Sequence, residues 1–172
     1  MDRRSMLNHL AVSGLGAAAL AAGMVPARAA GKDDAAAGRR LAQEFAASLT
    51  AHDMTRFAAI IADDYKQHQA IAPAAGVAPT GSAKDGVLRY FGARVKALPD
   101  LVVKAEIVVA SGNRMAANFV YTGTHKGEYF GVAPTGKRLT FNSTDIFIIR
   151  KGQLAEHWGA ADLLGLMNQL KG

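Results

Sequence analysis

The chain has 172 residues, half of them hydrophobic and 20% charged, which is the composition of a globular protein long enough for one domain with a sizeable core. It contains no cysteine, which excludes disulfides, thiolate metal sites and a cysteine nucleophile. The formal net charge is +6, but the basic residues are scattered along the sequence, so nucleic-acid binding is not favoured.

The first 29 residues have the pattern of an export signal. Paired Arg3 and Arg4 precede a moderately apolar run rich in Ala and Gly, and Ala27-Arg28-Ala29 provides a small-x-small cleavage site. The start also resembles the bacterial twin-arginine signal. The apolar run is too short and too weakly apolar for a transmembrane helix.

We therefore expect a signal peptide over residues 1–29, a mature extension over residues 30–38 and one domain over residues 39–172. After removal of the signal, the protein is expected in the periplasm or outside the cell, without a stable membrane anchor. Residues 40–49 then show helical periodicity, with Leu41, Phe45 and Leu49 on one side.

Two further helices are predicted before the periodicity changes. Asp53 can cap a second helix, and the run IADDYKQHQ is expected to end that helix. A loop rich in Ala, Pro and Gly follows. Ser82 and Asp85 then have the spacing of a capping box, and Pro99 stops the third helix near Leu98.

The rest of the chain has the alternation of β-strands. Residues 101–110 and 114–125 predict one hairpin, and residues 137–150 and 153–162 predict a second one around Lys151-Gly152. A short apolar helix ends the chain. Helices followed by an antiparallel meander indicate an α+β fold, with one curved sheet and helices packed on one face.

Two carboxylates interrupt the second hairpin. Alternation places Asp145 on the apolar face of its strand with Phe147. In the last strand His157 lies opposite the face that carries Asp162, unless a bulge near Gly159 shifts the register. A carboxylate on an apolar face is either a structural acid with hydrogen-bond partners or part of a cavity built for binding or chemistry.

A metal site is not favoured by the histidine pattern. His68, His125 and His157 are widely separated, and no His-x-His or His-x-x-x-His pair is present. Tyr65 lies three residues before His68, so both side chains can face the mouth of a pocket.

Two roles are possible for the aromatic residues of the strand region. Tyr121, Phe130 and Trp158 can stack on a flat ligand or belong to the hydrophobic core.

The motifs YKQHQ, LPD, GTHKGEYFG, PTGK and EHWGAAD follow one another along the chain. Their order resembles that of the SnoaL-like polyketide cyclase family, within the nuclear transport factor 2-like superfamily, and the resemblance runs from about Arg39 to Leu170. It implies a cone-shaped, strongly curved antiparallel sheet around a pocket that N-terminal helices close. It also implies a homodimer through the outer sheet face and no metal or organic cofactor.

The resemblance also suggests roles for individual residues. Characterised cyclases of this family use an aspartate as acid and base in an intramolecular aldol condensation, a role that falls here on Asp162. His68 corresponds to a pocket histidine that polarises the substrate, and Asp145 occupies an inward position that can exchange roles with Asp162. The residues expected to contact the substrate are Tyr65, Tyr121, His125, Phe130 and Trp158.

Two classes of function remain open, because this scaffold hosts many functions. One is a cofactor-free cyclase, isomerase or lyase that acts on a small apolar carbonyl compound. The other is a non-catalytic protein of the same fold that binds a small ligand. Export makes a product of cytoplasmic polyketide synthases a poor fit as substrate.

Overall fold

The computed structural model describes residues 32–69 and 81–172, so the expected export signal lies outside the described residues. The helices are α1 (Lys32–Thr50), α2 (Met54–Ala59), α3 (Ala83–Ala97) and α4 (Leu163–Lys171). The strands are β1 (Ile61–Gln67), β2 (Val102–Ser111), β3 (Arg114–Thr124), β4 (Arg138–Arg150) and β5 (Gln153–Ala161). This confirms the predicted α+β class. None of the described helices is long and apolar enough to cross a membrane.

The five strands form one mixed sheet in the order β1-β5-β4-β3-β2. Strand β1 runs parallel to β5, whereas all other neighbours are antiparallel. The sequence-based expectation of a purely antiparallel sheet is therefore wrong at this edge, as is the assignment of residues 61–67 to the end of a helix. From Ile61 onward the backbone pairs with β5, a partner near the other end of the chain that local periodicity does not reveal.

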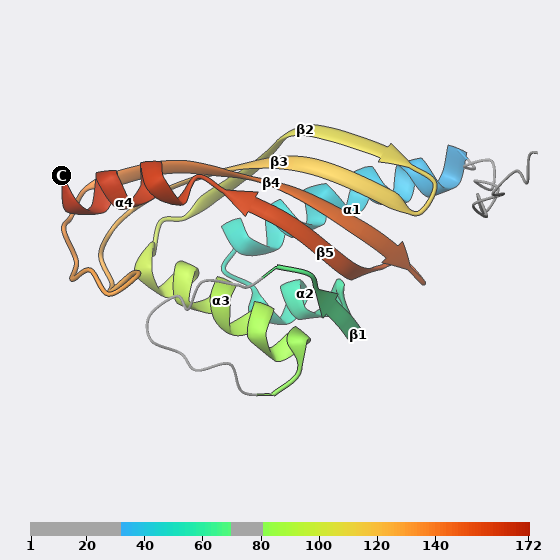
Figure 1. Ribbon diagram of the computed structural model, residues 1–172, viewed down its shortest axis with the longest axis horizontal. Helices are drawn as coiled ribbons and strands as arrows, with labels where there is room; N and C mark the ends of the chain where they lie inside the picture. Colours follow the sequence, from blue (N-terminus) through green and yellow to red (C-terminus); the bar gives the residue numbers. More distant parts are fainter. Residues whose placement is uncertain (1–31, 70–80) are drawn as a thin grey trace, which may run out of the picture.

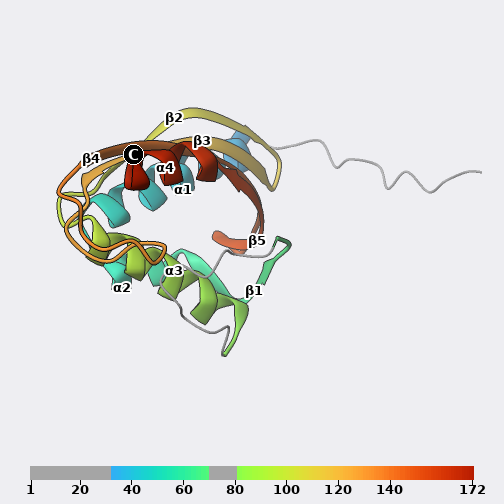
Figure 2. The same cartoon turned by 60° about the vertical axis from the view of Figure 1, so that its left-hand side comes forward.

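The helices and the sheet lie in layers. Strands β2 to β5 form one layer with α1 directly beneath it, and α2 and α3 lie further from the sheet (Figure 1). In the rotated view the sheet arches over α1, with α3 on its open side (Figure 2). This curvature leaves the inner face of the sheet opposite α3.

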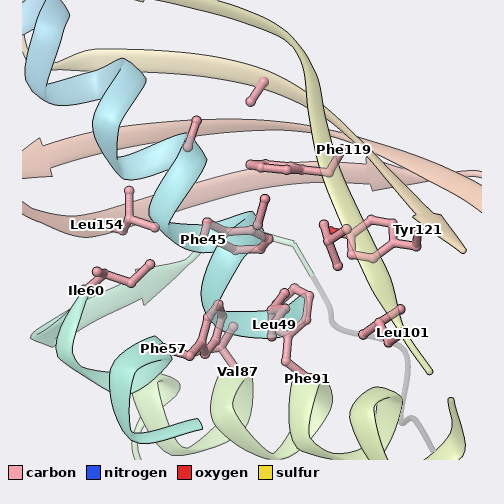
Figure 3. Packing of buried hydrophobic residues seen from close by; sticks show 14 of the residues in the cluster. Phe45, Leu49, Phe57, Ile60, Val87, Phe91, Leu101, Phe119, Tyr121 and Leu154 are labelled. Atoms are coloured by element: carbon pink, nitrogen blue, oxygen red, sulfur yellow. The ribbon is translucent and has the colours of Figure 1, made fainter. Parts of the chain in front are cut away.

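The hydrophobic core is built around Phe45 of α1 (Figure 3). Its ring stacks on Phe119 of β3 with 4.4 Å between centroids, and it meets Phe57 and Phe91 edge-on at 5.2 Å. These rings join three helices to the sheet, and such pairs stabilise a core beyond the burial of their area.

A β-bulge in β5 sets the direction of the last side chains of the sheet. Ile148 pairs with Glu156 but Ile149 pairs with Leu154, so Ala155 is the extra residue. Beyond Ala155 the alternation is reversed, and His157 lies opposite Phe147 on the inner face. The sequence analysis allowed for a bulge near Gly159, whereas the register shift lies at Ala155.

Candidate functional site

A cavity of about 110 Å³ lies between α3 and the inner face of the sheet. One part of its lining is polar and the other apolar or aromatic, the combination typical of small-molecule sites. The polar side chains are Gln67, Gln69, Arg94, Ser143, Asp145 and His157, and the apolar and aromatic ones include Val87, Tyr90, Phe91, Tyr121 and Leu163.

Asp145 of β4 is the acid of this cavity. It is 6% exposed, and both of its carboxyl oxygens have partners. Oδ1 lies 2.8 Å from Nε2 of His157, and Oδ2 accepts a hydrogen bond of 2.5 Å from the hydroxyl of Ser143. These contacts supply the compensation that a buried carboxylate needs.

The second nitrogen of His157 fixes the protonation of the pair. Nδ1 lies 2.8 Å from Oε1 of Gln67, which also accepts a hydrogen bond of 2.8 Å from the hydroxyl of Tyr65. An amide oxygen is only an acceptor, so Nδ1 carries a hydrogen. Nε2 then shares one proton with Asp145, held on either the imidazole or the carboxyl group. In both arrangements the pair has no net charge.

Gly159 of β5 pairs with Asp145 and leaves room for this contact. A Cβ atom at this position would lie 2.3 Å from Asp145 Oδ1 and 2.6 Å from His157 Nε2. The backbone N–H of Gly159 donates to Oε1 of Gln69 at 2.8 Å, which holds the strand in place. The acid–histidine pair therefore depends on the absence of a side chain here.

Arg94 of α3 is 2% exposed and lines the same cavity. Nε donates to the hydroxyl of Tyr129 at 2.8 Å, and Nη2 donates to that of Tyr90 at 2.9 Å. Burial works to lower the pKa of Arg94, but the hydroxyls of Tyr129, Tyr90 and Tyr121 outweigh it and raise the pKa above its ordinary value. The guanidinium is therefore charged.

Two tyrosines complete the polar network. The hydroxyl of Tyr121 lies 3.3 Å from Oγ of Ser143. Burial raises the pKa of both Tyr121 and Tyr65, so each remains a neutral hydroxyl.

Of the residues predicted from the sequence, Asp145 and Tyr121 line the cavity, and Tyr65 reaches it through Gln67. Asp162 instead lies at the surface as the N-cap of α4, where Oδ1 accepts a hydrogen bond of 2.8 Å from the N–H of Gly165. The structure therefore does not bring the two aspartates together.

His68 and Trp158 lie away from the cavity lining. Their rings are stacked with 3.9 Å between centroids, and His68 Nε2 lies 2.8 Å from a carboxyl oxygen of Glu156. Hydrogen bonds from His68 and Arg150 lower the pKa of Glu156. This contact joins β1 to β5 beside Gln67.

The last two candidates, His125 and Phe130, also do not line the cavity. His125 is buried and lies 3.0 Å from the hydroxyl of Thr135, whereas Phe130 packs beside Tyr129. Within residues 32–69 and 81–172, no group of three or more His, Asp or Glu side chains is arranged to hold a metal ion.

Sequence reasoning missed five site residues, and it weighed one of them, His157, only as a metal ligand: Gln67, Arg94, Ser143, His157 and Gly159. The sequence did contain a signal for Arg94. This residue lies three positions after Phe91 on the buried face of its helix, and a cation is rarely buried there unless it has a partner. Gln67 gave no such signal, because its strand was assigned to a helix.

A family model for the SnoaL-like polyketide cyclases matches residues 39–170. TsrD from Streptomyces laurentii is similar in structure, with a TM-score of 0.69 and 24% identity over 79% of this chain and 96% of its own. AclR from Streptomyces galilaeus has a TM-score of 0.67 and 25% identity over 78% and 85%. IdmH from Streptomyces antibioticus has a TM-score of 0.63 and 23% identity over 78% and 99%. No curated protein sequence matches significantly.

Proposed function

Because the chain belongs to the SnoaL-like polyketide cyclase family, we propose that it is a cofactor-independent acid–base enzyme of the cyclase, isomerase or lyase type. Its substrate is a small carbonyl compound. The observation that carries this proposal is the pair formed by Asp145 and His157, which share one proton at 2.8 Å in the wall of a cavity.

The geometry supports removal of a proton from a carbon beside a carbonyl group. With the shared proton on His157, the carboxylate of Asp145 accepts the substrate proton, and both members of the pair are then protonated. A proton from the pair then returns to a carbon or oxygen of the product, which restores the pair. Because the protons of the pair exchange with solvent between the two steps, deuterium enters the product in D₂O. A preorganised polar wall favours the charge that develops on the enolate oxygen.

This proposal assigns the acid–base role to Asp145 and not to Asp162, because the carboxylate of Asp162 is exposed and caps a helix. It assigns the histidine role to His157 and not to His68 for the same reason of placement. Neither member of the alternative pair lines the cavity.

The size of the cavity supports a small substrate. About 110 Å³ is less than the roughly 300–1,000 Å³ of pockets for drug-sized ligands. Val87, Phe91 and Leu163 supply apolar lining for the carbon skeleton.

Exchange of carbon-bound hydrogen for deuterium tests the catalytic step, with butanone and cyclohexanone as probes followed by NMR in D₂O. The wild-type protein is expected to accelerate exchange beside the carbonyl, and Asp145→Asn to lose about 10²-fold or more of this acceleration. Asp162→Asn is the matched control, because Asn caps a helix as well as Asp does.

Equal exchange by Asp145→Asn and the wild type would contradict the assigned base. Binding of the ketones without any acceleration by the wild type would identify a ligand-binding protein of the same fold instead.

We also propose that the protein is exported. Arg3 and Arg4 before a weakly apolar run, followed by the small-x-small cleavage site, support this. Changing both arginines to lysine is expected to retain the precursor in the bacterial cytoplasm. Normal delivery of this double variant to the periplasm would exclude the twin-arginine route.

We also propose a homodimer through the outer face of the sheet. The apolar side chains that support it are exposed in the single chain: Ile107 is 64% exposed, Val109 63% and Ile146 47%. Burial of such a patch against a second copy removes it from water.

A further inference from the structure

We propose that the substrate of this cavity carries a carboxylate and that Nη1 of Arg94 binds it. The placement of the reaction at Asp145 rests on the function proposed above, whereas binding of the carboxylate by Arg94 does not depend on it. The substrate class is therefore a small keto acid.

The first support is a nitrogen without a partner. Nε and Nη2 of Arg94 donate to Tyr129 and Tyr90, but Nη1 is buried and has no hydrogen-bond partner in the described part of the chain. A buried donor left unpaired reduces stability, so a native structure that keeps one calls for an explanation. Because Arg94 lines the cavity, an oxygen of a ligand bound there is the partner that we propose for Nη1.

The second support is the charge of the cavity. No described Asp or Glu forms an ion pair with Arg94. Among the described residues of the lining, Asp145 is the one acid, and it is neutralised by His157 through their shared proton. Arg94 is therefore a positive charge without an ion-pair partner in the described part of the chain, and such a charge attracts an anionic ligand.

The aromatic rings around Arg94 compensate this charge only in part. The guanidinium carbon lies 4.3 Å from the ring centroid of Tyr121, and 4.9 to 5.1 Å from those of Tyr90, Phe91 and Phe141. Ring faces attract a cation, but they do not replace a strong acceptor for Nη1. A carboxylate supplies both the negative charge and the acceptor.

The arrangement also orients the substrate. Arg94 lies on α3, whereas Asp145 and His157 lie on the facing sheet, and all three line one cavity. A keto acid with its carboxylate at Arg94 therefore presents its carbonyl end to the acid–base pair. Binding of a group remote from the reacting atoms assists catalysis by fixing this orientation.

Two probes of nearly equal size separate charge from shape: 4-oxopentanoate and its neutral amide, 4-oxopentanamide. The wild-type protein is expected to bind the acid about tenfold to a hundredfold more tightly, the factor that one charge-assisted hydrogen bond provides. Arg94→Met is expected to lose this preference. Asp145→Asn is expected to keep it, which separates this inference from the proposed reaction.

A measurement on the wild-type protein covers the case in which Arg94→Met does not fold. The ¹⁵N signals of the Arg94 guanidinium, assigned through contacts with Tyr90 and Tyr121, are expected to shift with the acid and not with the amide. Equal affinity for both probes, failure of the acid to bind, or a preference that survives in a folded Arg94→Met variant would each overturn the proposal. A clear preference without catalysed deuterium exchange would instead contradict only the proposed reaction.

Discussion

Asp145 and His157 lie within hydrogen-bond distance because Gly159 carries no side chain between them. Its role is steric and independent of charge or polarity. The same position has no unusual backbone angle, since Gly159 is not among the glycines with positive φ. Substitution at Gly159 therefore tests the contact without an effect of backbone strain.

Gly159→Ala is expected to reduce deuterium exchange by about tenfold or more, because the new Cβ atom forces Asp145 and His157 apart. The exchange assay and thermal melting check this together. Gly86→Ala is the matched control, because it lies in α3 with open space around it, and is expected to keep activity and to melt no lower. Unchanged exchange in a folded Gly159→Ala protein would show that the pair tolerates separation.

His125 gives the stability of the protein a dependence on pH. Burial lowers its pKa, so the unfolded chain binds a proton at higher pH than the folded one. Stability is therefore fully present above the ordinary histidine pKa of about 6.5 and decreases as the pH falls towards the lowered value.

Urea unfolding of the wild type and His125→Gln between neutral and mildly acidic pH measures this contribution. The stability advantage of the wild type is expected to shrink as the pH falls. An advantage that stays constant or grows would contradict the assigned sign.

Helix α3 carries Arg94 to the cavity, and its start is fixed by the capping box of Ser82 and Asp85 that the sequence predicted. The hydroxyl of Ser82 accepts a hydrogen bond of 3.1 Å from the N–H of Asp85, and the Asp85 carboxylate accepts one of 2.9 Å from the N–H of Ser82. These bonds lower the pKa of Asp85. The first turn of α3 is thus stabilised by its own sequence.

Ser82→Ala is expected to reduce the free energy of unfolding by about 0.5–2 kcal/mol, because the N–H of Asp85 loses its acceptor. Chemical denaturation measures the loss. Ser111→Ala, an exposed serine at the end of β2, is the control and is expected to change stability by less than about 0.5 kcal/mol. Equal stability of the two variants would show that the cap is not needed.

The outer sheet face has a row of apolar side chains that crosses four strands. Val109, Ala116, Ile146 and Trp158 are cross-strand neighbours in β2, β3, β4 and β5. Helix α1 packs on the inner face of the sheet, and Figure 1 shows none of the described helices on the opposite face of β2 and β3. The homodimer proposed above buries this row against a second copy of the chain.

Ile146→Lys is expected to convert the proposed dimer into a monomer, because it places a charge in the middle of the row. Sedimentation of residues 30–172 at micromolar concentration measures the assembly. Leu164→Lys is the control, since Leu164 is 75% exposed but lies on α4, away from the row. A wild-type protein that sediments as a monomer would contradict the proposed assembly.

The sequence by itself determined the features that depend on neighbours along the chain. Helical and strand periodicity, the capping box at Ser82 and the turn at Lys151-Gly152 each result from a few adjacent residues, and the structure contains them except at residues 61–67, which form a strand. Asp145 was a candidate from its alternation alone, and the order of motifs already resembled the family that the chain belongs to.

Only the tertiary structure decided which of these side chains meet. The parallel pairing of β1 with β5 brings Gln67 to His157, and the bulge at Ala155 turns His157 towards Asp145. Both depend on backbone hydrogen bonds between segments far apart in the sequence, which local propensity does not encode. The same reason separates Asp162 from the site: a helix begins directly after it and uses its carboxylate as a cap.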